Sequence, residues 1–187
     1  MIFHETRVAG VFEVYLEPKT DDRGFFARAW CQREFESRGL NPNVVQCNIS
    51  FNRHKGTLRG MHYQTEPHTE AKLVRCTRGA VYDVALDLRA QSPTYRKWVA
   101  AELTSEKRNM MYIPEDCAHG FLTLAGDTEV FYQMSNFYAP DAGRGVRWND
   151  PVFQIDWPAS IEVISARDRS YPDFTLNDKP TASYRAS

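Results

Sequence analysis

The sequence predicts an all-β protein built as an antiparallel sandwich or barrel. Short runs rich in β-branched, aromatic and alternating residues recur along the chain with turn residues between them, whereas only two short segments favour a helix. The length of 187 residues is sufficient for one domain with a substantial core. We therefore expect a single domain over residues 1–187, with a loose polar tail from about residue 173.

The predicted strands follow from their content of β-forming residues and from alternation between turn residues. In chain order they cover residues 11–17, 24–30, 44–51, 57–64, 71–77, 80–88, 98–103, 110–113, 120–124 and 129–137. Short helices are predicted over residues 32–38, where Gly39 provides a C-cap, and over residues 161–168. Helices are therefore expected only at the periphery of a β core.

The predicted strand 44–51 has one polar and one apolar face. Its alternation places Gln46, Asn48 and Ser50 on one face and Val45, Cys47, Ile49 and Phe51 on the other. Taken alone, the strand favours a solvated polar face, the commoner arrangement in antiparallel sheets, while the alternative is a polar barrel interior that binds a ligand. In strand 80–88, Asp83 and Asp87 lie opposite the large apolar residues, and we interpret both as structural.

Composition and charge limit the partners and the location. The formal net charge of −1 gives no general reason to expect nucleic acid or an anionic membrane as a partner. Residues 1–10 include charged side chains where a signal peptide needs an apolar core, and no apolar run reaches the length of about eighteen residues that spans a membrane. The cysteines, Cys31, Cys47, Cys76 and Cys117, form no CxxC pair and are interpreted as buried thiols of a cytoplasmic protein.

Several separated motifs carry a resemblance that covers residues 3–173. They are DRGFF at 22–26, QCNIS at 46–50, LRGMHYQ at 58–64, AKLV at 71–74, IP at 113–114 with AHGF at 118–121, WNDP at 148–151 and IDWP at 155–158. In this order and spacing the sequence resembles the dTDP-4-dehydrorhamnose 3,5-epimerase family. The resemblance implies a cupin-type double-stranded β-helix, a jelly-roll barrel with a few short peripheral helices. It also implies a cofactor-independent isomerase of cytoplasmic dTDP-rhamnose and O-antigen biosynthesis.

The implied reaction converts dTDP-4-dehydro-6-deoxyglucose to dTDP-4-dehydrorhamnose by inverting C3 and C5. Inversion next to a ketone needs a base, an acid on the opposite face and a group that holds the enolate charge. By resemblance, His62 is the base, Asp168 orients it, Tyr132 is the acid, and Lys72 contacts the C4 oxygen. Histidine suits the role of base because its ordinary pKa is about 6.5. Asp168 also fits a helix-capping box with Ser165, and the two roles are compatible.

The resemblance also implies residues that bind the substrate. Arginine forks suit phosphate oxygens, which assigns Arg23, Arg59 and Arg167 to the diphosphate. The other predicted substrate-binding residues are Gln46 and Asn48 as amide contacts, His119 as a substrate or pocket-orienting residue, and Phe26 and Tyr138 as pocket-lining residues.

Arg59 and His62 have opposite parity, so a regular strand would direct them to opposite faces of its sheet. A β-bulge at Gly60 would bring both side chains into one cavity. We therefore predict a bulge at this glycine.

Many cupins bind a transition metal through an HxH pair, and here that pair is replaced by His62-Tyr63-Gln64. We predict no metal and no cofactor. Arg28 stands where the family often has a glutamate, and the loop 18–22 is shorter than usual, which leaves CDP and GDP open as alternatives to TDP.

Three alternatives to double epimerisation remain. A mono-epimerase acts at C3 or C5 only, a 3,4-ketoisomerase moves the carbonyl, and a non-catalytic cupin binds a nucleotide sugar without reaction. The resemblance further implies a homodimer with a sheet shared between subunits.

Overall fold

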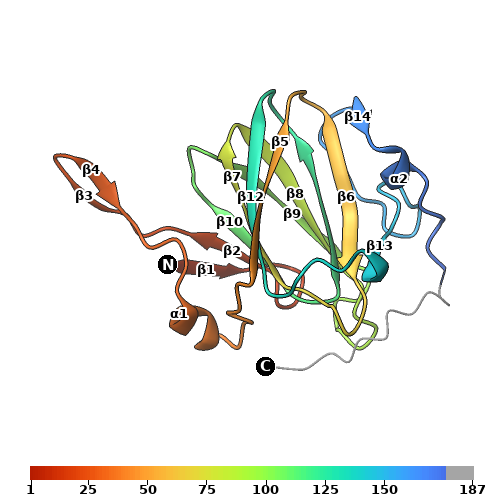
Figure 1. Ribbon diagram of the computed structural model, residues 1–187, viewed down its shortest axis with the longest axis horizontal. Helices are drawn as coiled ribbons and strands as arrows, with labels where there is room; N and C mark the ends of the chain where they lie inside the picture. Colours follow the sequence, from red (N-terminus) through yellow and green to blue (C-terminus); the bar gives the residue numbers. More distant parts are fainter. Residues whose placement is uncertain (176–187) are drawn as a thin grey trace.

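Two antiparallel sheets form the body of the computed structural model, which describes residues 1–175 (Figure 1). The first sheet has the order β1 (Ile2–Glu5), β2 (Phe12–Tyr15), β10 (Met110–Ile113), β7 (Lys72–Arg78), β12 (Thr128–Met134) and β5 (Gln46–Asn52). The second has the order β13 (Gly143–Gly145), β6 (Thr57–Gln64), β11 (Cys117–Thr123), β8 (Ala80–Asp87) and β9 (Trp98–Thr104). The predicted jelly-roll is confirmed. The predicted tail lies outside the described residues from 176 onward.

Each predicted range contains a strand, with shifts of a few residues at most ends. The predicted strand 24–30 is wrong over residues 27–30, because β4 covers only Gly24–Phe26. The structure adds short strands that the sequence did not indicate, namely β1, β3 (Lys19–Asp21), β13 and β14 (Val163–Ile164). β3 forms a hairpin with β4, and β14 pairs in parallel with β6. The first predicted helix is α1 (Gln32–Glu36), with Gly39 at φ +68° shortly after its end. The second prediction, 161–168, is wrong over its first half, because β14 lies there and α2 covers only Ala166–Arg169.

The main core lies between the two sheets, where inward-facing residues alternate along each strand. It includes Val74, Cys76, Val81, Ala85, Leu103, Met111, Phe121 and Val130. A second cluster packs α1, through Phe35, on the outer face of the first sheet, and a third packs Phe153 and Ile155 on the outer face of the second. Each fully buried side chain of this size contributes about 1.5–3 kcal/mol relative to exposure.

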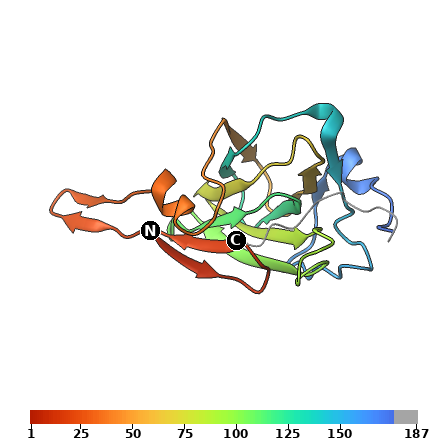
Figure 2. The same ribbon diagram turned by 90° about the horizontal axis from the view of Figure 1, so that it is seen from below.

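A hairpin of β3 and β4 (Gly24–Phe26) projects from the barrel in both views (Figures 1 and 2). Its aromatic residues are not covered, since Phe25 is 46% and Phe26 74% exposed. The predicted binding residues Arg23 and Phe26 therefore lie on an arm outside the barrel rather than on its inner wall.

The interpretation of the cysteines holds for Cys76 and Cys117, which are buried, and is wrong for Cys47, which is exposed, and for the partly exposed Cys31. Cys47 is exposed because the apolar face of β5 points away from the barrel. None of the helices within residues 1–175 has the length and hydropathy needed to cross a bilayer.

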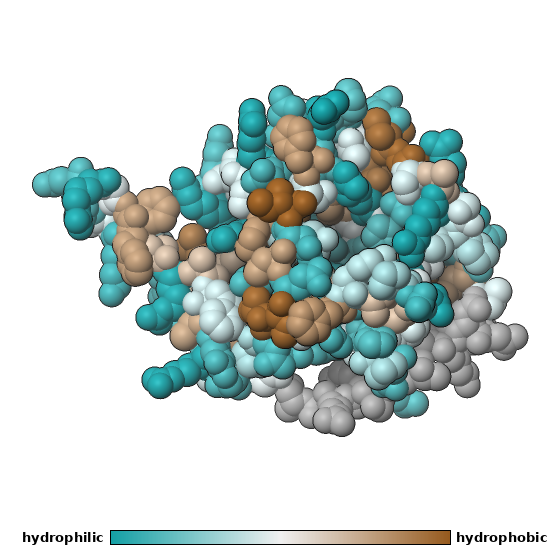
Figure 3. Space-filling view, viewed as in Figure 1, coloured by the Kyte–Doolittle hydropathy of each residue, from teal (hydrophilic) through white to brown (hydrophobic). Residues whose placement is uncertain are grey.

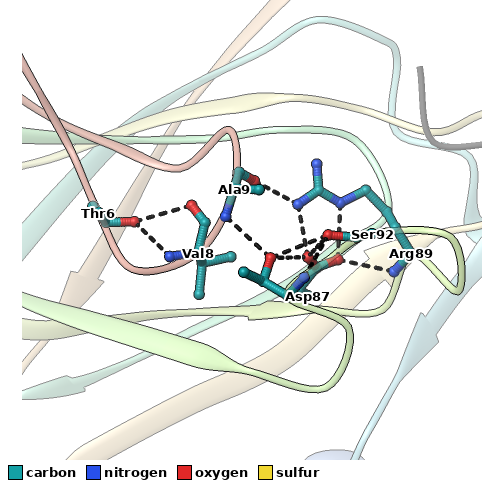
Figure 4. A network of polar contacts seen from close by, with 7 residues as sticks. Thr6, Val8, Ala9, Asp87, Arg89 and Ser92 are labelled. Atoms are coloured by element: carbon teal, nitrogen blue, oxygen red, sulfur yellow. Dashed lines mark hydrogen bonds and ion pairs between the residues drawn. The ribbon is translucent and has the colours of Figure 1, made fainter. Parts of the chain in front are cut away.

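A buried polar network ties the loop after β8 to the loop between β1 and β2 (Figure 4). Asp87, at the end of β8, accepts hydrogen bonds from the Arg89 guanidinium and from the hydroxyls of Ser92 and Thr94. Arg89 then donates to the carbonyl of Ala9. The prediction that Asp87 is structural agrees with these contacts.

Candidate active site

A cavity of about 630 Å³ opens between the two sheets. All but two of the predicted site residues line it, namely Gln46, Asn48, Arg59, His62, Lys72, His119, Tyr132, Tyr138, Arg167 and Asp168. The exceptions, Arg23 and Phe26, lie on the projecting hairpin. The walls of the cavity come from β5, β7 and β12 on one side and from β6, β11 and α2 on the other.

The strand β5 corrects the interpretation favoured by its sequence alone. Gln46, Asn48 and Ser50 line the cavity, while Ile49 and Phe51 on the opposite face are 64% and 45% exposed. Within the described chain no layer packs on this outer face, as the exposure of its side chains shows. The polar face is therefore the inner one.

His62 and Asp168 form a hydrogen-bonded pair at the wall of the cavity. The distance from His62 Nε2 to Asp168 Oδ1 is 2.7 Å, and the second oxygen of Asp168 accepts from the backbone N–H of Gly60 at 3.3 Å. Burial would raise the pKa of Asp168, but the hydrogen bonds from His62 and Gly60 outweigh it and hold that pKa below its ordinary value. An ionised carboxylate is thus placed to stabilise an imidazolium on His62.

The short helix α2 holds Asp168 in position through its own cap. Ser165 is the N-cap residue, and its hydroxyl accepts from the backbone N–H of Asp168 at 3.0 Å. The parallel pairing of β14 with β6 brings this segment against the strand that carries His62. The backbone N–H of Asp168 thus serves the helix cap, while its side chain binds His62. The role of Asp168 in catalysis stays a prediction.

The predicted bulge at Gly60 is confirmed. On β11, His119 pairs with His62 and Phe121 with Arg59, so β6 contains one residue more than its partner between these pairs. Gly60 has φ +139°, and a Cβ there would lie 2.5 Å from the Cα of Gly120. Only glycine fits this crossing. Because of the extra residue, the side chains of Arg59 and His62 point to the same side of β6, and both face the cavity.

Lys72 and Tyr132 enter the cavity from the opposite sheet. The Lys72 ammonium is almost fully buried, donates to the carbonyl of His62 at 3.4 Å, and forms an ion pair with Glu70 at 2.8 Å. Burial raises the pKa of the Tyr132 phenol, the nearby Arg59 charge lowers it, and the net shift is upward. Tyr132 therefore stays protonated at neutral pH.

A second imidazole–carboxylate pair lies beside the first. His119 Nε2 is 2.8 Å from Asp83 Oδ1, and both side chains are buried. Since His119 pairs with His62 across β11 and β6, the two imidazoles lie on neighbouring strands. The structural interpretation of Asp83 was incomplete, because its carboxylate orients a cavity residue.

Arg167 at the cavity wall contacts two tyrosines. Its side chain contacts the hydroxyl of Tyr138, and its Nε donates to the hydroxyl of Tyr171 at 3.0 Å. The ring of Tyr171 packs on Gly145, where any Cβ would overlap it, and stands edge to face with His62 at 6.3 Å between ring centroids. Tyr171 thus contacts both an arginine of the cavity and the imidazole of the pair.

A family model described as dTDP-4-dehydrorhamnose 3,5-epimerase matches residues 5–175. The chain belongs to this family. A dTDP-4-dehydrorhamnose 3,5-epimerase from Sinorhizobium fredii is 40% identical over 92% of this chain and 89% of that protein. The predicted enzyme class, an isomerase of nucleotide sugars, is that of the family.

Solved structures of relatives have the same fold. The 3,5-epimerase from Elizabethkingia anophelis has a TM-score of 0.91 at 36% identity and covers 96% of this chain and 98% of its own. An epimerase from Legionella pneumophila, solved in complex with dTDP-4-keto-L-rhamnose, has a TM-score of 0.90 at 32% identity and covers 99% of both chains. A dTDP-4-dehydrorhamnose 3-epimerase from Streptomyces niveus is also related, 36% identical over 87% of this chain and 78% of that protein.

Sequence reasoning missed several residues of the cavity region, namely Glu70, Asp83, Arg144 and Tyr171. Glu70 was detectable in part, because it lies two positions before Lys72 and thus has the same parity. Tyr171 gave no local signal, since its contact with Gly145 depends on how the segment after α2 returns to β13.

Within residues 1–175 no group of three or more His, Cys, Asp or Glu side chains is arranged to hold a metal ion. The two cavity histidines are each paired with a carboxylate instead. The prediction of a metal-free site stays a prediction, which metal analysis of the purified protein tests.

Proposed function

We propose that this chain inverts both C3 and C5 of dTDP-4-dehydro-6-deoxyglucose, with His62 as the base and Tyr132 as the acid. One observation carries the proposal: His62 on β6 and Tyr132 on β12 line a single cavity from opposite sheets. Inversion requires proton removal from one face of a sugar ring and proton return to the other. A ring held between the sheets meets both groups.

The proposed steps follow from the contacts around these two residues. His62 takes the proton on carbon beside the C4 ketone, and Asp168 stabilises the imidazolium that forms. The electrons of the broken C–H bond move toward C4, and the resulting enolate oxygen accepts a hydrogen bond from Lys72. Tyr132 gives its hydroxyl proton to carbon on the opposite face. Solvent then reprotonates Tyr132 and takes the proton from His62.

The remaining cavity residues are proposed to hold the substrate. Arg59 and Arg167 fit the diphosphate, because each presents a guanidinium at the cavity wall. Arg59 is fixed by donation from its Nε to Asn52 at 2.7 Å. The amides of Gln46 and Asn48, the ring of Tyr138 and the imidazole of His119 are proposed to contact the sugar and the nucleotide.

We propose a homodimer in which the hairpin of one copy supplies Arg23 and Phe26 to the cavity of the other. Both residues belong to a family motif, yet both lie on a projecting arm, with the Arg23 side chain 90% exposed. Apolar side chains also gather over β5 on the face shown in Figure 3, where Val45, Ile49 and Phe51 are exposed. An uncovered apolar edge strand fits a sheet shared between subunits. Light scattering tests this proposal, which a monomer at micromolar concentration contradicts.

Solvent exchange distinguishes the candidate reactions. The 4-keto nucleotide sugar is incubated with the protein in heavy water and followed by NMR at each ring carbon. Deuterium at both C3 and C5 is expected. Exchange at one carbon indicates a mono-epimerase, which the Streptomyces niveus relative makes the second candidate. Movement of the carbonyl indicates a 3,4-ketoisomerase, and binding without exchange indicates a non-catalytic cupin.

We also propose that the protein acts in the cytoplasm, in dTDP-rhamnose supply for surface polysaccharides such as O-antigen. Cys76 and Cys117 are buried as free thiols, which fits a reducing compartment. Fractionation of cells that carry a tagged protein tests the location.

A further inference from the structure

Glu70 places a buried carboxylate in the wall of the cavity, although the proposed chemistry gives it no role. Glu70 is 6% exposed and lies two residues before Lys72, the first residue of β7. Burying a carboxylate is unfavourable without compensation. Its charge also repels the enolate that forms in the same cavity. A glutamate at this position therefore needs a specific reason.

The contacts of Glu70 lead to Lys72. Glu70 Oε1 lies 2.8 Å from Lys72 Nζ, and within residues 1–175 this is the single ion pair of that ammonium. In the same described residues, the ammonium also donates one hydrogen bond, at 3.4 Å, to the carbonyl of His62. A lysine side chain is flexible and carries a compact charge, so a partner must fix where its donors point. Glu70 supplies that partner.

The second oxygen of Glu70 is buried and has no hydrogen-bond partner in the part of the chain that the structure describes. Native proteins satisfy most buried polar atoms, and exceptions concentrate at functional sites. If Glu70 only stabilised the fold, both oxygens would be expected to bond. The arrangement instead favours a carboxylate whose role is to orient the Lys72 ammonium.

We propose that Glu70 is a positioning residue for epimerisation, whose carboxylate holds the Lys72 ammonium in the orientation that meets the C4 oxygen. This inference rests on the proposed function. It deepens that function by assigning a role to a charged residue of the same cavity.

The charge of Glu70 also affects the pKa of Tyr132, the proposed acid. The charged and titratable groups that share the cavity with Tyr132 include Arg59, His62 and His119 from the opposite sheet, Lys72 and Glu70 at β7, Tyr138 after β12, and Arg167 and Asp168 of α2. Among them, Arg59, Glu70 and Tyr138 act on its pKa. Burial is the largest cause of the raised pKa of Tyr132, Arg59 opposes it, and Glu70 adds to it. Removal of the Glu70 charge should therefore lower the pH at which Tyr132 loses its proton.

The test replaces Glu70 with glutamine, which keeps the shape and removes the charge. For Glu70→Gln we expect kcat for C3 and C5 exchange to fall about tenfold, with KM changed less than about threefold, because an interaction made in the transition state is weakened. The alkaline limb of the kcat profile should move to lower pH. The control is Glu66→Gln, which removes the same charge from an exposed position nearby and should match the wild type. A wild-type kcat and profile for Glu70→Gln overturn the inference.

Glu70→Asp covers the case in which the glutamine variant fails to fold. Aspartate keeps the charge but withdraws the carboxylate by one methylene from Lys72. We expect kcat to fall while the alkaline limb stays at its wild-type pH. A Glu70→Asp variant with wild-type kcat, or one that loses only thermal stability, shows a merely structural role.

A chemical readout separates this inference from the proposed function. Acylation of Lys72 by acetic anhydride, followed by mass spectrometry, should be several-fold faster in Glu70→Gln than in the wild type, because an ion-paired ammonium is less reactive. This rate does not depend on the reaction that the protein catalyses. Absence of wild-type exchange refutes the proposed function, whereas an unchanged acylation rate refutes the role of Glu70.

Discussion

Asp87, the last residue of β8, and Asp168, in the short helix α2, are both buried aspartates, and they differ in the number of hydrogen bonds that their carboxylates accept. Asp87 accepts from the backbone and guanidinium of Arg89 and from two hydroxyls. Asp168 accepts from Gly60 and from His62, whose side chain is 42% exposed. A carboxylate closed within its own loop stabilises the fold. A carboxylate paired with a solvent-accessible imidazole is available for chemistry.

The same contrast extends to the whole cavity. Within residues 1–175 the buried side-chain atoms with no hydrogen-bond partner are Ser50 Oγ, Glu70 Oε2 and Asp83 Oδ2. Ser50 and Glu70 line the cavity, and Asp83 holds the cavity residue His119. In this described part of the chain the buried side-chain polar atoms around Asp87 all have hydrogen-bond partners, whereas several around the cavity have none. Unpartnered buried polar atoms are expected at functional sites.

The largest expected effect is on catalysis, at the His62–Asp168 pair. His62→Asn should lower the exchange rate at both carbons about a thousandfold, because it removes the general base. The melting temperature should fall less than for Asp87→Asn, since the imidazole is partly exposed and Asp168 keeps its hydrogen bond from Gly60. NMR exchange and calorimetry measure the two quantities. The control is His54→Asn, an exposed histidine outside the cavity lining, which should retain activity.

Asp87→Asn should give the opposite result. The substitution removes the charge of a buried ion pair with Arg89, so we expect the free energy of unfolding to fall by about 3 kcal/mol. Exchange kinetics below the melting temperature should stay near those of the wild type. Urea unfolding gives the stability, and Asp127→Asn, at an exposed aspartate, is the matched control. If Asp87→Asn lost activity while keeping its stability, the division between the two regions would be wrong.

Tyr171→Phe tests whether Tyr171 belongs to the substrate-binding site. It removes the hydroxyl that accepts from Arg167 and keeps the ring against Gly145 and His62. We expect KM to rise about three- to tenfold with kcat nearly unchanged, because one charge-assisted hydrogen bond is lost from a binding residue. In an Arg167→Met background the same change should have no further effect on KM. Additive effects in this cycle would place Tyr171 outside the site.

The smallest expected effect concerns acid stability. Burial opposes ionisation of Asp87, but the hydrogen bonds from Arg89, Ser92 and Thr94 outweigh it and hold its pKa below the ordinary value. The unfolded chain therefore takes up this proton first, and the stabilisation is present above the ordinary aspartate pKa of about 3.9. It is lost as the pH falls through the lower folded value. Melting temperatures from pH 6 to about 2 should fall less steeply for Asp87→Asn than for the wild type.

The longer strands and ten of the residues that line the cavity were predictable from the sequence. Alternation and turn residues located each long strand, because these signals are local. The family motifs identified His62, Asp168, Lys72 and Tyr132 as site residues, and all four line one cavity. The bulge at Gly60 also followed from the sequence, since only an extra residue reconciles the parity of Arg59 with that of His62.

Tertiary structure alone decided which face of β5 is covered, that Glu70 pairs with Lys72, and that Arg23 and Phe26 lie on a projecting arm. Alternation separates two faces of a strand, but it does not say which face another sheet will cover. The order of strands in the sheets settles this, and strands adjacent in space lie far apart in the chain. Burial and pairing of a charge are therefore properties of the assembled barrel, because neighbours from distant segments replace the water around it.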